Sequence, residues 1–483
     1  MPENLKQKTI SAMLWSTLGK FGTLSIQFIA NMVLARLLMP EDYGCIGMLM
    51  IFMVISEVLI TGGFGQALIQ KKNPTHLDYT TVFYWNLVAS VIIYFLLYVV
   101  SPFISEFYNM PQLCDILRVY SLTLIISSFS IVQNNLLQKQ LKFKSLTIRN
   151  VISTSCGTII AIIMAFNGFG VWSLVASAII NSITSVCLLW KMSSWRPTWD
   201  FSWKSFKELF SFGSLMAFSS LVDEFYKEMQ GLIIGKFYSA SSLGYYTQAK
   251  KLENIPVSSL SQIVSQVTFP VFSKLQDDKA LLKRAVKKCI VSLTYLNFPM
   301  CVLLIVIASP LIKLLYGSQW LPAIPYFQLL CVSGLMYTIM TMNNTIIKSL
   351  GKSNIFLYVR LIQRFIGLII IAIGASYSII GLLIGVIISN IISYFITTVV
   401  NMKLIKYGFI EQIQDIIKNL LLSVVIGLVT YSIDIMVTFN EFIVMFLQII
   451  TYIGLYALCS KTLKITGYKV FEEVVKSKIS KNK

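Results

Sequence analysis

Charged residues are scarce in this chain, at 13% of its 483 residues, whereas 56% are hydrophobic and the mean hydropathy is +0.74. So apolar a composition excludes an ordinary soluble domain. The only histidine is His76, and the eight cysteines include no C-x-x-C pair, so we expect neither a disulfide framework nor a metal site. The sequence also lacks a G-x-x-x-x-G-K-[ST] loop, which argues against ATP hydrolysis by this chain.

Long apolar runs are the main feature of the sequence. A helix needs about 20 apolar residues to cross about 30 Å of hydrocarbon. Runs of that kind predict an all-α polytopic membrane protein with about 14 transmembrane helices, near residues 14–38, 44–66, 82–103, 114–136, 146–166, 170–190, 207–233, 243–270, 288–312, 323–346, 355–375, 379–401, 416–437 and 442–460. The first run carries Lys20, Gln27 and Asn31 and has no small-residue cleavage site, so we expect it to remain as the first helix.

The distribution of charge predicts the orientation in the membrane. Basic residues outnumber acidic ones by 40 to 21, for a net charge of +19. About thirty of the forty basic residues fall in alternate loops, and the opposite loops hold little more than Arg36, Arg118, Lys236 and Lys313. By the positive-inside rule both termini are cytoplasmic. The charge therefore reports topology, and we expect no nucleic-acid partner.

The chain repeats itself at an offset of about 200 residues. SPFISEFY at 101–108 returns as SPLIKLLY at 309–316, and the span from Arg36 to Gly44 returns as that from Lys236 to Gly244. Asn134 and its neighbour Asn135 return as Asn343 and Asn344. These landmarks predict two parallel six-helix lobes around a central cavity, plus two extra C-terminal helices. The predicted boundaries are 1–203 for helices 1–6, 204–406 for helices 7–12, 407–462 for helices 13–14 and 463–483 for a cytoplasmic tail.

Polar residues inside the apolar runs predict what lines that cavity. Ser16, Lys20, Thr23, Gln27 and Asn31 recur every three or four residues, so they share one helix face. A matching stripe with Asp223 and Lys227 follows 200 residues later. A charge at the bilayer centre costs at least about 2.5–3.5 kcal/mol, so such groups need water, a partner or a ligand. The predicted substrate-binding residues are Lys20, Gln27, Asn31, Glu57, Asp223, Lys227, Lys250, Lys251, Asn254 and Arg364.

Cations outnumber anions in this set, as suits an anionic ligand such as a phosphate or pyrophosphate head group, and the amides suit sugar hydroxyls. Two interpretations stay open for the acidic residues. Glu57 and Asp223 are candidates for coupling transport to protons or Na⁺, or they are counter-ions to the lysines. Asp223, Glu224, Lys227 and Glu228 also lie at spacings that allow a self-contained structural network. No cofactor is expected beyond a coupling ion.

The chain resembles a known family in several motifs: LARLLMPEDYG at 34–44, GGFGQALIQKK at 62–72, GFGVWSLV at 168–175, WRP at 195–197, IIGKFYSASSLGYY at 233–246 and FPVFSKLQ at 269–276. These resemble the polysaccharide transporter branch, the Wzx-like oligosaccharide flippases, of the multidrug/oligosaccharidyl-lipid/polysaccharide exporters. The resemblance implies a bacterial cytoplasmic-membrane protein that moves an undecaprenyl-diphosphate-linked oligosaccharide outward by alternating access. Implied products are O-antigen, capsule or exopolysaccharide, and implied partners are membrane lipids, a polysaccharide polymerase and other assembly proteins.

Three alternatives stay open at this point. An exporter of drugs or small metabolites and a lipid II flippase would share the architecture. A membrane glycan polymerase is a more remote alternative, because the outer loops are short and show no paired carboxylates for catalysis. The expectation is therefore a transporter and not an enzyme.

Overall fold

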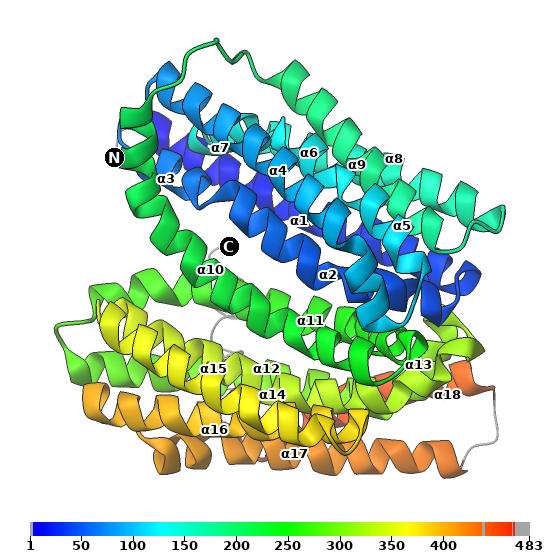
Figure 1. Ribbon diagram of the computed structural model, residues 1–483. Helices are drawn as coiled ribbons and strands as arrows, with labels where there is room; N and C mark the ends of the chain where they lie inside the picture. Colours follow the sequence, from blue (N-terminus) through cyan, green and yellow to red (C-terminus); the bar gives the residue numbers. More distant parts are fainter. Residues whose placement is uncertain (1–2, 437–439, 466, 469–483) are drawn as a thin grey trace. The chain divides into compact units, whose positions relative to one another are not determined.

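The computed structural model describes residues 3–436, 440–465 and 467–468 (Figure 1). Over that part of the chain it has eighteen α-helices, one 3₁₀-helix and no strand, which confirms the all-α prediction. Two compact units divide the chain, residues 1–244 and 245–483. The predicted lobe boundaries stay a prediction, and most of the predicted tail at 463–483 lies outside the described residues.

The helices of the first unit are α1 (Glu3–Leu37), α2 (Pro40–Thr61), α3 (Phe64–Gln70), α4 (His76–Tyr108), α5 (Gln112–Tyr120), α6 (Leu122–Ser128), α7 (Ile131–Lys139), α8 (Phe143–Phe166), α9 (Val171–Met192) and α10 (Trp203–Phe237). α8 packs against both α1 and α9, and α10 packs against α2, α3 and α4 (Figure 1). The chain turns sharply between α2 and α3 at Gly62 and Gly63, whose φ values are 52° and 71°. A side chain on Gly63 would strike the carbonyl group of Gly213, so this turn requires glycine.

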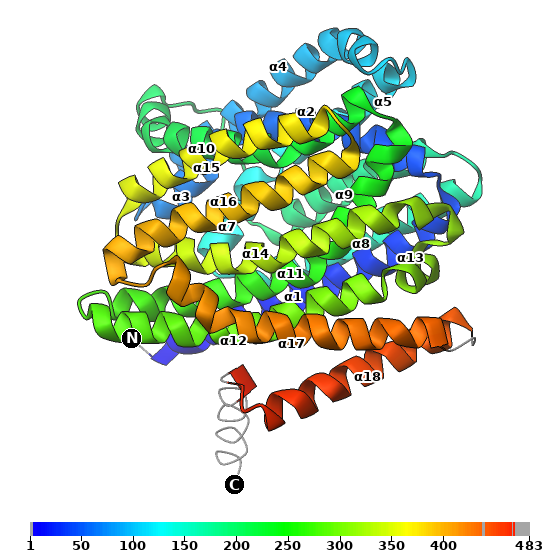
Figure 2. The ribbon, with the colours of Figure 1, turned by 90° about the horizontal axis from the view of Figure 1, so that it is seen from below.

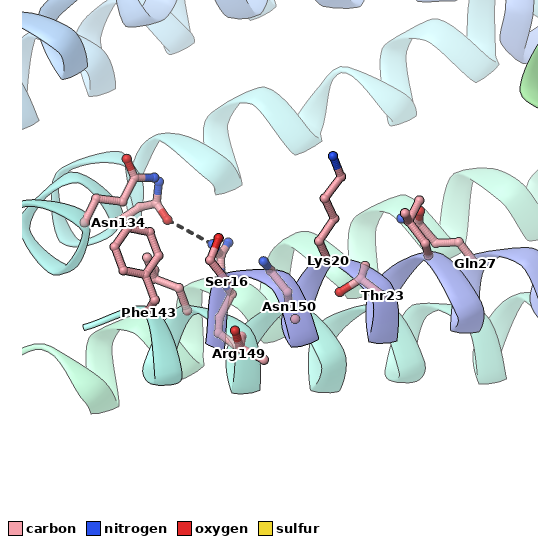
Figure 3. A pocket seen from close by; sticks show the side chains of 13 residues that line it. Ser16, Lys20, Thr23, Gln27, Asn134, Phe143, Arg149 and Asn150 are labelled. Atoms are coloured by element: carbon pink, nitrogen blue, oxygen red, sulfur yellow. Dashed lines mark hydrogen bonds between the residues drawn. The ribbon is translucent and has the colours of Figure 1, made fainter. Parts of the chain in front are cut away.

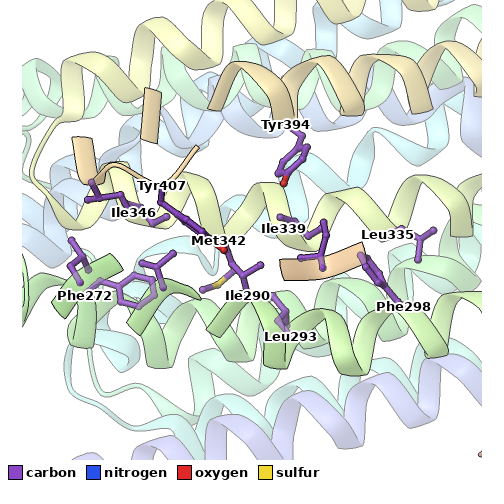
Figure 4. Packing of buried hydrophobic residues seen from close by; sticks show 14 of the residues in the cluster. Phe272, Ile290, Leu293, Phe298, Leu335, Ile339, Met342, Ile346, Tyr394 and Tyr407 are labelled. Atoms are coloured by element: carbon purple, nitrogen blue, oxygen red, sulfur yellow. The ribbon is translucent and has the colours of Figure 1, made fainter. Parts of the chain in front are cut away.

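The chain passes into the second unit within α11 (Ala240–Lys274). The other helices of that unit are α12 (Lys279–Val306), α13 (Ala308–Tyr316), the 3₁₀-helix η1 (Ser318–Ala323), α14 (Ile324–Ser349), α15 (Ser353–Ala375), α16 (Ile379–Ile405), α17 (Phe409–Met436) and α18 (Glu441–Thr462). Its core is built from α11, α12, α14, α16 and α17. Figure 4 shows the interdigitated side chains, which include Phe272, Ile290, Phe298, Met342, Tyr394 and Tyr407.

Buried polar groups also join the last helices to this core. The side-chain amide of Asn419 in α17 donates to the carbonyl oxygen of Val291 at 3.1 Å and to the Thr294 hydroxyl at 3.0 Å. Tyr456 in α18 donates to the carbonyl oxygen of Tyr295 at 3.0 Å. In Figure 2, α17 runs beside α12, with α18 following it. Both helices are therefore integral to the packing of the second unit.

The helix bounds repeat with the sequence. α1 and α10 each have 35 residues and begin 200 positions apart, at Glu3 and Trp203. Each ends with a basic residue in its last turn, Arg36 or Lys236, and the next helix begins at Pro40 or Ala240. The landmarks found in the sequence thus mark corresponding helix ends in the structure.

Many of the helices are long and apolar enough to span a membrane. Eleven helices of the described chain are long and apolar enough to cross a membrane, and a twelfth span results if Gln112–Ser128 and Ile131–Lys139 count as one bent span. A multi-span membrane protein is therefore confirmed, whereas the count of fourteen stays a prediction. α10 and α11, at 35 residues, are about 50 Å long but are not among the eleven. Their predicted spans carry the polar residues singled out from the sequence.

Candidate binding cavities in the first unit

The polar stripe of the first helix lies where α1 crosses α8. Gly19 permits the crossing, because a side chain there would strike Thr147 of α8. The Thr147 hydroxyl donates a hydrogen bond of 2.8 Å to the carbonyl oxygen of Trp15, which fixes the register of the two helices. Residues of α1 that follow at helical spacing then face a cavity of about 360 Å³.

This cavity is lined by two basic side chains, Lys20 of α1 and Arg149 of α8. Neutral polar groups surround them: Ser16, Thr23, Gln27, Asn134, Gln138, Thr147 and Asn150. Among the described residues that line it, none is acidic. Figure 3 shows the side chains of α1 and α8 together with Asn134 of α7. The cavity is therefore cationic and rich in hydrogen-bonding groups.

Arg149 is held in place by neutral partners. Its guanidinium donates to the Ser185 hydroxyl at 2.9 Å. It also donates to the side-chain oxygen of Asn134 at 2.9 Å (Figure 3). Its Nε atom is buried without a hydrogen-bond partner, and no acidic side chain of the described chain pairs with it. The sequence prediction missed Arg149 because it counted this residue with the basic loop that precedes the fifth span. Its position nearly two turns inside α8, which begins at Phe143, is the signal that would have found it.

A second cavity of the same unit, of about 320 Å³, contains Glu57. Its described lining includes the carboxylate of α2 and the neutral oxygens of Thr61, Tyr120, Thr123, Ser127, Asn181 and Ser182, but no basic residue. Ser127 donates to Ser182 across it at 3.4 Å. The first unit thus has one cationic and one anionic cavity, formed by different sets of helices.

The structure places the other predicted site residues outside these two linings. Asn31 is on α1, and Asp223 and Lys227 are on α10, where Lys227 forms an ion pair of 2.5 Å with Glu224. That ion pair is one contact of the local network that the helical spacing of Asp223, Glu224, Lys227 and Glu228 allows.

Four predicted site residues belong to the second unit: Lys250, Lys251 and Asn254 of α11, and Arg364 of α15. The ammonium group of Lys250 lies 5.4 Å from the ring centre of Tyr246. One cavity shared by all ten residues stays a prediction.

Comparison with known proteins identifies the family. Residues 33–325, more than half of the chain, match the family described as polysaccharide biosynthesis protein. The chain belongs to this family. The match confirms the relationship that the sequence motifs predicted, and it includes α8 with Arg149 and α2 with Glu57.

Three relatives named for polysaccharide biosynthesis or transport align over most of the chain. It is 25% identical to the teichuronic acid biosynthesis protein TuaB of Bacillus subtilis, over 90% of each protein. It is 24% identical to the lipopolysaccharide biosynthesis protein WzxC of Escherichia coli, over 81% of each. It is 26% identical to the succinoglycan biosynthesis transport protein ExoT of Rhizobium meliloti, over 75% of this chain and 74% of ExoT.

Solved structures show which fold this family member has. The lipid II flippase MurJ, in an inward closed conformation, superposes with a TM-score of 0.76 at 18% identity, over 93% of this chain and 99% of MurJ. An inward-facing multidrug transporter of the MATE family gives a TM-score of 0.61 at 14% identity, over 82% of this chain and 98% of the transporter. The chain therefore shares the fold of these two transporters.

Proposed function

We propose that this protein is a flippase that moves an undecaprenyl-diphosphate-linked oligosaccharide across the bacterial cytoplasmic membrane by alternating access. The product would serve O-antigen, capsule or exopolysaccharide synthesis. The family, the relatives named for polysaccharide biosynthesis and transport, and the transporter fold support this proposal. In this proposal the protein is a transporter rather than an enzyme, and both termini are cytoplasmic, as the alternation of basic loops predicts.

The observation that carries the proposal is the cationic cavity of the first unit. A diphosphate has negative charge and acceptor oxygens, which arginine and lysine recognise by charge-assisted hydrogen bonds. Lys20 and Arg149 supply these donors, and Arg149 is already oriented by Asn134 and Ser185. The surrounding amides and hydroxyls suit the first sugars. The polyprenyl chain stays in lipid, and other assembly proteins such as a polysaccharide polymerase take the product outside.

The anionic cavity is a candidate site for ion coupling. Glu57 supplies one negative charge, and the surrounding hydroxyl and amide oxygens are ligands that a hard cation accepts. A proton on Glu57 or a bound Na⁺ would both neutralise the carboxylate. Asp223 is the second candidate from the sequence, and its neighbour Glu224 is already paired with Lys227.

Reconstitution of the full-length protein in liposomes tests the proposal. The probe is a polyprenyl diphosphate trisaccharide, and its arrival in the outer leaflet is measured by lectin binding. We expect the wild type to transfer the probe and the double variant Lys20→Ala/Arg149→Ala to lose most of the transfer. Lys72→Ala is the matched control, because Lys72 is an exposed cation outside both cavities.

Two results would contradict the proposal. The first is transfer by the double variant at the wild-type rate, which would remove the cationic cavity from the mechanism. The second is transport of a small organic cation such as ethidium with no transfer of the lipid-linked trisaccharide, which would favour a drug exporter on the same fold.

A further inference from the structure

A glutamate in the second unit is buried inside the helix bundle. Glu253 of α11 is only 8% exposed and packs against α14 at Gly334. A Cβ atom on Gly334 would lie 2.7 Å from Oε1 of Glu253, so the absence of a side chain there makes room for the carboxyl group. Glycine at this position therefore forms part of a pocket that fits the glutamate.

The surroundings of this carboxyl group are poor in charge and in free hydrogen-bonding groups. A Cβ atom built on Gly334 would lie 3.1 Å from Val257 of α11 and 3.6 Å from the Cys301 thiol of α12. The nearby amide of Asn297 is already used, since it donates to the carbonyl oxygens of Gly334 at 3.2 Å and Leu335 at 3.5 Å.

Lys250 lies one turn earlier on α11, and it does not form an ion pair with Glu253. Its ammonium group interacts with the Glu253 charge at a distance and lies over the ring of Tyr246. No hydrogen bond or ion pair joins Glu253 to any residue that the structure describes. An ionised carboxylate in such a place loses most of its hydration and has no ion pair to offset that loss.

We propose that Glu253 is a proton-binding site, neutral when closed between α12 and α14 and ionised when α11 exposes it to water. A proton suits this site better than a metal cation. Hard cations take several oxygen ligands, whereas a thiol and aliphatic groups surround this carboxyl. Among the described residues, no group of three or more His, Cys, Asp and Glu side chains could hold a metal ion. Binding a proton requires only the carboxylate itself.

α11 contains a proline close to this glutamate, where the helix can bend. Pro256 lies inside the helix, three residues after Glu253. Proline has no N–H group, so the carbonyl group of Leu252 loses its helical hydrogen bond, and the proline ring opposes a straight helix. The helix can therefore bend at the turn that carries Glu253. Bending there would move the carboxyl group away from Gly334 and Cys301, into contact with water.

The internal repeat supports a functional role for this carboxyl group. α2 and α11 are corresponding helices, with Pro40 matching Ala240 and Gly44 matching Gly244. Glu57 would match position 257, so Glu253 lies one turn earlier on the same face. Each repeat thus carries a glutamate at a similar position in the middle of its second helix. The one in the first unit opens into a cavity of about 320 Å³, and the one in the second is closed off.

Infrared spectroscopy of the full-length protein in nanodiscs tests the proton site directly. A proton on Glu57 would give the same band, so the spectra are recorded in a Glu57→Gln background. There we expect a carbonyl band of a protonated carboxylic acid at neutral pH, which disappears when Glu253→Gln is added. Glu106→Gln is the matched control, because Glu106 is exposed, and it should keep the band. Glutamine resembles a neutral glutamate in size, so this variant should fold, and thermal unfolding checks that. A band that persists when Glu253→Gln is added, or is absent from the Glu57→Gln background, would overturn the proposal.

A second measurement tests whether the proton on Glu253 drives transport. This coupling role, unlike the proton site itself, rests on the proposed flippase function. Transfer of the polyprenyl diphosphate trisaccharide is followed in liposomes with and without an imposed pH gradient. We expect the gradient to speed the wild type, and Glu253→Gln to transfer at the unstimulated rate with no response to the gradient. Stimulation that survives in Glu253→Gln, or is absent from the wild type, would overturn the coupling role. Failure of the wild type to move the probe at all would instead overturn the flippase, while the infrared result would still decide the proton site.

Discussion

Arg149 and Lys227 are two basic side chains of the first unit that differ in how their charge is balanced. Arg149 is oriented by Asn134 and Ser185, which are both neutral, so its positive charge stays unbalanced by any acidic side chain of the described chain. Lys227 lies 2.5 Å from the Glu224 carboxylate, which offsets its charge. A buried charge with neutral partners costs more free energy than a paired one, and an anionic ligand would recover that cost.

We therefore expect Arg149→Lys to bind the polyprenyl diphosphate trisaccharide more weakly than the wild type. Lysine keeps the charge, but it lacks the planar guanidinium with which arginine can donate to Asn134, Ser185 and an anion at the same time. A lost hydrogen bond to a charged group costs about 1.5–3 kcal/mol, which corresponds to a roughly 10- to 100-fold higher Kd. Surface plasmon resonance on the purified protein measures this, with Lys72→Ala as the control. An unchanged Kd for Arg149→Lys would mean that the guanidinium does not contact the head group.

For Lys227, we expect a different pattern in a double-mutant cycle with Glu224. Lys227→Ala leaves the Glu224 carboxylate unbalanced, and that negative charge should reduce transfer of an anionic lipid. Lys227→Ala/Glu224→Gln removes both charges, so its transfer rate should return toward the wild-type rate. A double variant as slow as Lys227→Ala alone would instead indicate that Lys227 contacts the substrate itself, as the sequence predicted.

At the scale of helices, two glycines hold the corresponding ends of the repeat together within the first unit. A side chain on Gly44 of α2 would strike the carbonyl group of Ala240, and a side chain on Gly244 would strike that of Pro40. Gly44 and Pro40 lie 200 positions before Gly244 and Ala240, so the internal repeat makes the two contacts equivalent. Both glycines belong to the landmarks by which the repeat was recognised, and this crossing gives a physical reason for their presence.

We expect Gly44→Ala and Gly244→Ala each to destabilise the protein by about 1–3 kcal/mol, the usual cost of forcing extra atoms into a packed contact. Thermal unfolding of the purified protein measures the change. Gly454→Ala is the matched control, because Gly454 lies in α18 with nothing within 4 Å of an added Cβ atom. That control should be neutral or stabilising by up to about 1 kcal/mol, since alanine favours a helix. Equal melting temperatures for all three variants would mean that the crossing relaxes without cost.

The helices also show which features the sequence could predict. Composition and run length predicted the all-α membrane fold, because crossing lipid imposes a length that can be read directly. The repeat predicted that α1 and α10 correspond, and their bounds differ by 200 at both ends. Arg149 was missed because a basic residue near the end of an apolar run looks like a loop residue. The contact between Gly44 and Ala240 joins segments almost 200 residues apart, so neither propensity nor periodicity could predict it.

At the scale of the whole molecule, the contacts of α17 and α18 show that these helices are part of the packed second unit and not an appendage to it. The sequence predicts an extra pair outside the repeat, yet Ile416 of α17 belongs to the same core cluster as residues of α12 and α14. In lipid, helices gain little from the hydrophobic effect, so packing and hydrogen bonds between helices hold them together. Asn419 provides such bonds to Val291 and Thr294, and salt bridges of 2.7 Å join Lys283 to Glu411 and Lys287 to Asp415.

We therefore expect a chain that ends at residue 406 to lose a stable second unit. Without α17, the core of the second unit is left open to lipid on one side, and Thr294, Lys283 and Lys287 each lose one partner. Deleting even a single large side chain from a packed core costs about 2–5 kcal/mol, which is large beside the total stability of a domain. Size-exclusion chromatography of the detergent-purified chains measures the outcome, with a chain ending at residue 468 as the control that keeps α17 and α18. A monodisperse chain of residues 1–406 that still binds the polyprenyl diphosphate trisaccharide would show that α17 and α18 are accessory, because the repeat alone would then suffice for folding and binding.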